Sequence, residues 1–220
     1  ITAGSTLRIG GDMVIGTRIT GGIAGLGIAK KILARKNIEA GDDILMTEGA
    51  GGGTIVTTAL YGGMPDVALE TMNIQFLKAS EVLLSSPLMK SIHACTDVTG
   101  FGLLGHLWEM LKSDNIAAEI HFSSVPIIPG TEQMARRNSI PGGTDANLDF
   151  LLGKVSWSNR VTEIMKIILA DAQTSGGLLF AVPETSADAF VEKLRQSGIS
   201  AANQIGIIIK SEKPGIIIDN

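Results

Sequence analysis

One stretch of the chain places a carboxylate, hydroxyls and glycines in an order that suits a phosphorylated ligand. Residues 92–95 predict the end of a strand, and residues 103–112 predict a helix. Between them lie Asp97, Thr99, Gly100 and Gly102. Backbone N–H groups at a helix N-terminus bind phosphate, and a nearby carboxylate can bind the accompanying Mg²⁺. We therefore expect Asp97 to bind Mg²⁺ and the other three to contact a nucleotide; the alternative is a turn capped by Asp97 or Thr99.

A second strand followed by glycines precedes this stretch. Residues 41–47 predict a turn and a strand, and residues 55–61 predict a helix. The glycine-rich turn between them offers further candidate nucleotide contacts, which are Gly51, Gly52, Gly53 and Thr54. Because such a turn can also start a helix without any ligand, a helix entry capped by Thr54 is the open alternative.

A third polar, glycine-rich segment, residues 171–177, precedes a buried strand predicted over residues 178–182. Paired glycines before a strand let another backbone approach closely. Asp171 and Gln173 are expected to line the same opening as the candidate substrate contacts, which are Thr174, Ser175 and Gly176. Together the three segments favour phosphoryl transfer, because that reaction needs positioned N–H donors and a metal rather than a covalent nucleophile.

Residues 95–106, Cys-Thr-Asp-Val-Thr-Gly-Phe-Gly-Leu-Leu-Gly-His, resemble the signature of the selenophosphate synthetases, or selenide, water dikinases. These enzymes belong to the superfamily of aminoimidazole ribonucleotide (AIR) synthase, thiamine-monophosphate kinase and hydrogenase maturation protein E. Residues 171–179 are similar to a second family motif, with Ala172 in place of its proline, and residues 125–147 resemble a third. The resemblance covers about residues 40–210 and implies that Asp97 binds magnesium at the phosphates of ATP.

The resemblance implies an α+β fold, an AIR synthase C-terminal-like domain in which helices cover a mixed sheet. Residues 1–20 are expected to be the tail, a strand remnant, of an N-terminal ATP-binding and dimerisation domain, and residues 21–220 the C-terminal domain. The implied reaction converts selenide, ATP and water into selenophosphate, AMP and phosphate. A small-molecule substrate and a homodimer are expected. The family's catalytic Cys or selenocysteine belongs to an N-terminal segment outside this sequence, so no catalytic residue is assigned.

Two positions depart from the family pattern and leave the substrate open. Glu48 stands where the family usually has Lys, and Gln75 with Phe76 stands where it has Leu-Asn. A carboxylate beside a triphosphate is unfavourable unless it points away or binds metal. Two alternatives to a selenophosphate synthetase therefore remain, a related ATP-dependent enzyme with another substrate and a non-catalytic domain that binds a nucleotide or a partner.

Composition limits the partners that we expect. The net charge of −4, without a basic block, argues against a nucleic-acid surface. No run reaches the roughly 20 apolar residues that span a bilayer, so no membrane partner is expected. The single cysteine, Cys95, excludes an intrachain disulfide and favours the cytoplasm. Because the chain starts with Ile1 rather than Met, we expect it to be part of a longer protein.

The remaining elements are expected to frame these three segments. Apolar patterns predict helices over residues 67–86, 161–169 and 185–198, and strands over residues 117–122, 205–209 and 215–218. Prolines and a glycine over residues 126–130 predict a loop, and residues 131–135 predict the start of a short helix. Residues 140–147 predict a shaped loop, with a helix from Leu148 onward. His106 is expected to cap or bond locally, and Cys95 to be a small buried hydrophobe.

Overall fold

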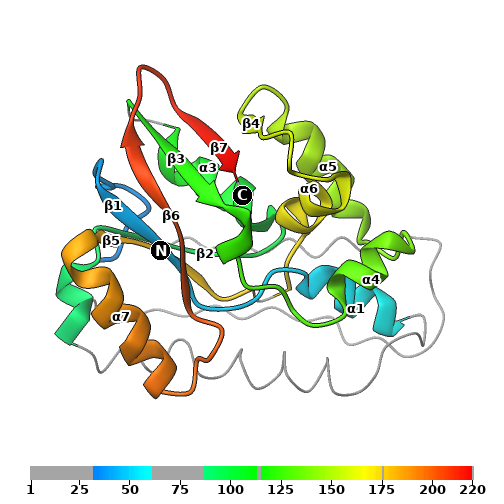
Figure 1. Ribbon diagram of the computed structural model, residues 1–220, viewed down its shortest axis with the longest axis horizontal. Coiled ribbons are helices and arrows are strands. Elements are labelled where there is room, and N and C mark those ends of the chain that lie inside the picture. The colour runs from blue at the N-terminus through cyan, green and yellow to red at the C-terminus, as the bar shows by residue number, and fades with distance from the viewer. Residues whose placement is uncertain (1–31, 61–86, 113–114, 175, 220) are drawn as a thin grey trace. The chain divides into compact units, whose positions relative to one another are not determined.

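A computed structural model describes residues 32–60, 87–112, 115–174 and 176–219 (Figure 1). The strand remnant expected over residues 1–20 and the helix predicted over residues 67–86 lie outside the described residues, as does Ser175. All the described helices and strands belong to one unit, Leu33–Asn220. None of these helices is both long and apolar enough to cross a bilayer.

A seven-stranded mixed sheet organises the described residues. Its strands, in chain order, are β1 (Asp42–Met46), β2 (Ala94–Asp97), β3 (Ile116–His121), β4 (Val155–Trp157), β5 (Leu178–Pro183), β6 (Asn203–Lys210) and β7 (Gly215–Asp219). Their spatial order is β2-β5-β1-β6-β3-β7-β4. The pairs β3–β7 and β7–β4 are parallel, and the other neighbouring pairs are antiparallel. The expected mixed sheet is therefore confirmed.

Helices α3 (Gly102–Leu111) and α7 (Glu184–Gln196) pack against opposite faces of the sheet (Figure 1). Helices α5 (Gly142–Leu151) and α6 (Glu163–Ala170) pack against α3, and α4 (Thr131–Arg136) packs against α6 and α1 (Gly52–Leu60). Two short 3₁₀ helices, η1 (Pro87–Ser91) and η2 (Phe122–Ser124), precede β2 and follow β3. The chain is thus an α+β domain with helices packed on a mixed sheet.

Neighbouring residues of β1 face two separate apolar clusters because side chains alternate along a strand. Ile44 packs with the cluster that contains Leu104 of α3 and Ile168 of α6. Leu45 packs with the opposite cluster, to which α7 contributes Phe190. All five residues of β1 are buried, which explains why this strand is continuously apolar after its first two residues.

The structure differs from the sequence analysis in the start of one helix and in one additional strand. The helix expected from Leu148 already begins at Gly142, because Pro141 has an extended backbone and starts the helix as its N-cap residue. The short strand β4 was not predicted. The last two strands, β6 and β7, are consecutive in the chain but do not pair with each other, since β3 lies between them.

Candidate functional site

The three segments singled out in the sequence meet where the carboxyl ends of β1 and β2 lie beside the start of β5. We call this region the junction and define it as residues 47–54, 97–102 and 171–178. Strands β1 and β2 both pair antiparallel with β5 from opposite sides, so their carboxyl ends meet the start of β5. The Leu178 amide donates to the Thr47 hydroxyl at 2.9 Å, and the Val98 amide donates to the Gly177 carbonyl at 3.0 Å.

Side chains from the third segment cap helix α1. The Asp171 carboxylate accepts hydrogen bonds from the Thr54 amide at 3.0 Å and from the Thr54 hydroxyl at 3.1 Å. The Gln173 side-chain oxygen accepts from the Gly52 amide at 2.9 Å. Asp171 is fully buried; burial raises the pKa of its carboxyl, and hydrogen bonds from Thr54, Thr144 and Gln173 oppose that shift.

This cap uses backbone amides within residues 51–54, the turn that was expected from the sequence to contact a nucleotide. Amides of Gly52 and Thr54 already donate within the chain, and Thr54 has no exposed surface. A phosphate at these amides would have to displace Asp171 and Gln173. Direct nucleotide contact by Gly51, Gly52, Gly53 and Thr54 stays a prediction, and the described role of the turn is to anchor α1.

Two glycines of the junction are required by close packing. A Cβ at Gly53 would lie 1.8 Å from the carbonyl oxygen of Ala172. A Cβ at Gly102 would lie 2.7 Å from the carbonyl oxygen of Ala170, and the φ of Gly102 is +67°. Side chains fit neither position, so the glycines let the three segments pack backbone to backbone.

The loop after Asp97 is held from three sides. The Thr99 amide donates to the His106 Nε2 atom at 3.0 Å. The Thr99 carbonyl accepts from the Gln173 amide at 3.0 Å, and the Gly100 carbonyl accepts from the Asn147 side chain at 3.0 Å. Helices α3 and α5 and the third segment therefore fix the loop that was expected to contact a nucleotide.

Accessible and buried residues separate clearly within the junction. Asp97 ends β2 with a side chain that is 38% exposed, and Gly100 and Thr174 are also exposed. Gly176 is buried and its amide donates to the Val98 carbonyl at 2.8 Å, while Ser175 lies outside the described residues. The surface that a ligand can reach is therefore centred on Asp97 and Gly100.

Sequence reasoning missed two residues that contact this surface. The Arg35 guanidinium donates to the Asp97 carboxylate at 3.2 Å, and the segment before it pairs with the edge of β2 through the Ala34 carbonyl and the Cys95 amide. Asn147 holds the Gly100 carbonyl from α5. Arg35 had no local signal, whereas Asn147 belongs to a segment that resembled the family.

The donor set at Asp97 fits a magnesium ion that a nucleotide helps to hold. Among the described residues, no three His, Cys, Asp or Glu side chains gather closely enough to bind a metal unaided. Mg²⁺ commonly binds one or two carboxylates and completes its shell with phosphate oxygens and water. A partly exposed Asp97 beside α3, whose N-terminus has no side-chain cap, suits such an arrangement.

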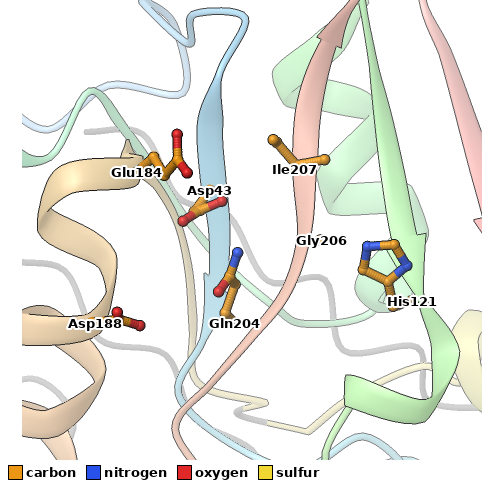
Figure 2. Close-up of a pocket in the computed structure, with 7 residues that line it drawn as sticks. All are labelled: Asp43, His121, Glu184, Asp188, Gln204, Gly206 and Ile207. Carbon is orange, nitrogen blue, oxygen red and sulfur yellow. The ribbon is translucent and has the colours of Figure 1, made fainter.

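A separate cavity lies on another part of the sheet and contains none of the predicted site residues. Figure 2 shows its seven lining residues, which come from β1, β3, β6 and the first turns of α7. The cavity has a volume of about 290 Å³ and includes the carboxyls of Asp43, Glu184 and Asp188. Burial, followed by the nearby charge of Glu184, raises the pKa of Asp43. Glu184 also stabilises the N-terminus of α7, which accounts for an acidic residue there.

The mixed sheet and its glycine-rich junction define an α+β domain of the AIR synthase type. The family described as AIR synthase related protein, C-terminal domain, matches residues 11–219, so the chain belongs to that family.

Several proteins are similar to the chain. An uncharacterized protein of Methanocaldococcus jannaschii is 52% identical over 53% of this chain and 26% of its own length. A selenide, water dikinase of Carboxydothermus hydrogenoformans is 38% identical over 84% of this chain and 54% of the relative, and one of Pelobacter propionicus is 33% identical over 96% and 61%. These matches confirm the resemblance. The chain spans about half the length of the dikinases.

Solved structures share the fold at low sequence identity. Hydrogenase maturation protein HypE in complex with ATP matches with a TM-score of 0.54 at 18% identity, over 81% of this chain and 45% of that chain. Thiamine-monophosphate kinase from Stenotrophomonas maltophilia K279a matches with a TM-score of 0.53 at 20% identity, over 84% and 52%. Both show the same fold as this chain.

Proposed function

We propose that the protein containing this chain is an ATP- and Mg²⁺-dependent phosphotransferase that makes selenophosphate from selenide, ATP and water. The observation that carries the proposal is the partly exposed Asp97 carboxylate beside the N-terminus of α3, which has no side-chain cap. Similarity to a selenide, water dikinase over 84% of the chain supports it. Because the chain spans about half of such relatives, the activity is proposed for the whole protein.

In this proposal Asp97 binds Mg²⁺, and Thr99, Gly100 and Gly102 contact the nucleotide. Mg²⁺, when bound, neutralises negative charge on the phosphates. The hydrogen bonds on the Thr99 and Gly100 carbonyls fix the loop before a ligand arrives, so binding orders little additional backbone. Exposed Thr174 lies in the third segment, and we assign the substrate side to Thr174, Ser175 and Gly176.

Glu48 favours a second candidate, a related ATP-dependent enzyme with a different substrate. This residue follows β1 at the junction, is 3% exposed, and replaces the Lys that selenophosphate synthetases usually have. Burial raises the pKa of the Glu48 carboxyl to about 7. An acid at this position, in place of the usual Lys, changes the charge that a substrate meets. The specific alternative is therefore an enzyme whose phosphoryl acceptor is not selenide.

We further propose that residues 21–220 are the C-terminal domain, residues 1–20 the tail of an N-terminal domain, and the whole protein a cytoplasmic homodimer. The family match over residues 11–219 supports the assignment of the C-terminal domain. Catalytic residues are expected in the N-terminal part of the longer protein.

The deciding experiment incubates the full-length protein with ATP and Mg²⁺, with and without selenide. Selenophosphate, AMP and phosphate should appear together and only when selenide is present. Release of AMP and phosphate at the same rate with and without selenide would favour the second candidate. If ATP is hydrolysed under neither condition and no nucleotide binds, only a non-catalytic domain that binds a partner would remain.

The role of Asp97 has its own test. Asp97→Asn removes the charge that binds Mg²⁺ but keeps the shape of the side chain, so it should weaken binding of a Mg²⁺-nucleotide by about tenfold or more. Asp149→Asn is the matched control because Asp149 is an exposed residue of α5. Equal nucleotide affinity of the two variants, measured by titration calorimetry, would remove Asp97 from the site.

A further inference from the structure

His106 has a definite hydrogen-bonding role inside α3. It is 3% exposed, and its Nε2 atom lies 3.0 Å from the Thr99 amide nitrogen and 3.1 Å from the Thr99 hydroxyl oxygen. A backbone N–H can only donate, so Nε2 must be the acceptor and cannot carry a proton. We therefore assign the neutral imidazole with its hydrogen on Nδ1.

That assignment leaves a buried donor unpaired. Among the residues that the structure describes, none forms a hydrogen bond with His106 Nδ1. Buried polar atoms without partners are uncommon, and each asks for an explanation. An apolar side chain could fill the same space without leaving a donor unpaired. The property that only histidine supplies here is therefore the acceptor at Nε2, which holds Thr99.

The backbone amide and carbonyl of Thr99 both form hydrogen bonds, whereas its hydroxyl hydrogen is still available. The amide is bound by His106, and the carbonyl accepts from the amides of Gln173 and Gly102. The lone pair of Nε2 is occupied by the amide hydrogen, so the hydroxyl hydrogen of half-buried Thr99 can turn toward another acceptor. A fixed backbone with a free hydroxyl donor is well suited to contact an anionic oxygen.

We propose that His106 is a positioning residue of the nucleotide site, which fixes Thr99 and leaves the Thr99 hydroxyl to donate to a phosphate oxygen. The inference rests on the proposed function, because it takes the ligand at this loop to be a Mg²⁺-nucleotide. His106 itself touches no reacting atom and acts through Thr99, two residues after Asp97. The ring of Phe101 lies next to the imidazole, with 5.6 Å between the two ring centroids.

The test compares two substitutions of similar size, one with a side-chain hydrogen-bond acceptor and one without. Gln can place its side-chain oxygen where Nε2 lies, whereas Leu cannot accept a hydrogen bond. His106→Leu should speed hydrogen exchange of the Thr99 amide and weaken the Mg²⁺ complex of a non-hydrolysable ATP analogue by about tenfold, whereas His106→Gln should stay within about threefold of wild type. A purely structural role would change thermal stability in both variants without this difference in affinity.

Controls separate the possible failures. His121→Leu changes an exposed histidine of β3 and should leave nucleotide affinity unchanged. Thr99→Val should weaken affinity while retaining protection of its amide, and it keeps the hydroxyl assignment testable if His106→Leu does not fold. Wild-type affinity in folded His106→Leu, or equal loss in both His106 variants, would overturn the positioning role. Full-length wild-type protein that binds no nucleotide would instead overturn the proposed function, while exchange of the Thr99 amide would still report whether His106 holds it.

Discussion

The carboxylate of Asp171 accepts a hydrogen bond from the Thr54 amide at 3.0 Å, across 117 positions of sequence. One buried acid thus ties the start of α1 to the segment that leads into β5. The same carboxylate also accepts from the hydroxyls of Thr54 and Thr144. Because the acid closes a helix N-terminus at the centre of the junction, we expect it to be a main determinant of the local fold.

Asp171→Ala should therefore destabilise the chain by about 2–4 kcal/mol, since it leaves several buried donors without an acceptor. Urea unfolding followed by circular dichroism measures this difference. Asp149→Ala, at an exposed position of α5, should change stability by less than about 0.5 kcal/mol. If both variants unfolded at the same urea concentration, the cap would not be a determinant of stability.

The glycines of the chain give a matched pair of opposite predictions. Gly53→Ala would place a methyl group 1.8 Å from the Ala172 carbonyl oxygen, so the backbone must move and we expect a loss of about 2 kcal/mol or more. Gly142→Ala has no atom within 4 Å of the added carbon and lies at the start of α5, so it should gain up to about 1 kcal/mol. Thermal unfolding of both variants tests the packing of the junction.

A Gly53→Ala variant as stable as wild type would show that the first turn of α1 and the Ala172 backbone are farther apart than described. Loss of stability in Gly142→Ala would instead point to a different start for α5. The two outcomes are independent, because no described residue beyond the chain neighbours of Gly142 lies within 4 Å of the added methyl group.

The elements of the sheet were predictable, but their meeting point was not. Apolar runs marked β5 and the last three residues of β1, because strands buried on both faces are largely apolar. Helix α1, in contrast, begins at Gly52 rather than at the predicted residue 55. Its first amides are bound by Asp171 and Gln173, which are more than 100 residues away in sequence. No local pattern contains that contact.

The candidate site shows the same limit. The stretch around Asp97 and the segment 171–177 were each recognisable, and glycines marked both as places of close approach. Their contact depends on β5 lying between β1 and β2, which is a property of sheet order rather than of spacing. Arg35 could not be assigned because its relation to Asp97 arises only when the segment before β1 runs along the edge of β2.

The ion pair between Arg35 and Asp97 gives a prediction about metal binding. Both side chains are partly exposed, 43% for Arg35 and 38% for Asp97, so the pair should contribute less than about 1 kcal/mol to stability. If Asp97 binds Mg²⁺, the guanidinium competes with the metal for the same carboxylate. Arg35→Ala should then lower the Mg²⁺ concentration needed for half-maximal nucleotide binding by up to about fivefold.

A Mg²⁺ titration at a fixed concentration of a non-hydrolysable ATP analogue measures this change. Arg137→Ala is a suitable control, since Arg137 is exposed after α4 and lies outside the junction. A higher Mg²⁺ requirement in Arg35→Ala would mean that Arg35 contacts the nucleotide itself rather than competing with the metal.

Glu48 predicts how stability depends on pH. Burial raises the pKa of its carboxyl from 4.5 to about 7, so the folded state holds this proton more tightly than the unfolded state. Between pH 4.5 and about 7 the folded chain therefore binds more protons, and the contribution of Glu48 to stability is lost as the pH rises through that window. The loss should reach at most about 3 kcal/mol above pH 7.

Glu48→Gln keeps the shape of the side chain and cannot ionise, so it should become more stable than wild type as the pH rises from 5 to 8. Urea unfolding at several pH values gives the difference between the two proteins, in which contributions from all other titrating groups cancel. Glu212→Gln, at an exposed position between β6 and β7, should show no such trend. A constant difference between Glu48→Gln and wild type across this range would mean that the Glu48 carboxyl ionises as freely in the folded chain as in the unfolded one.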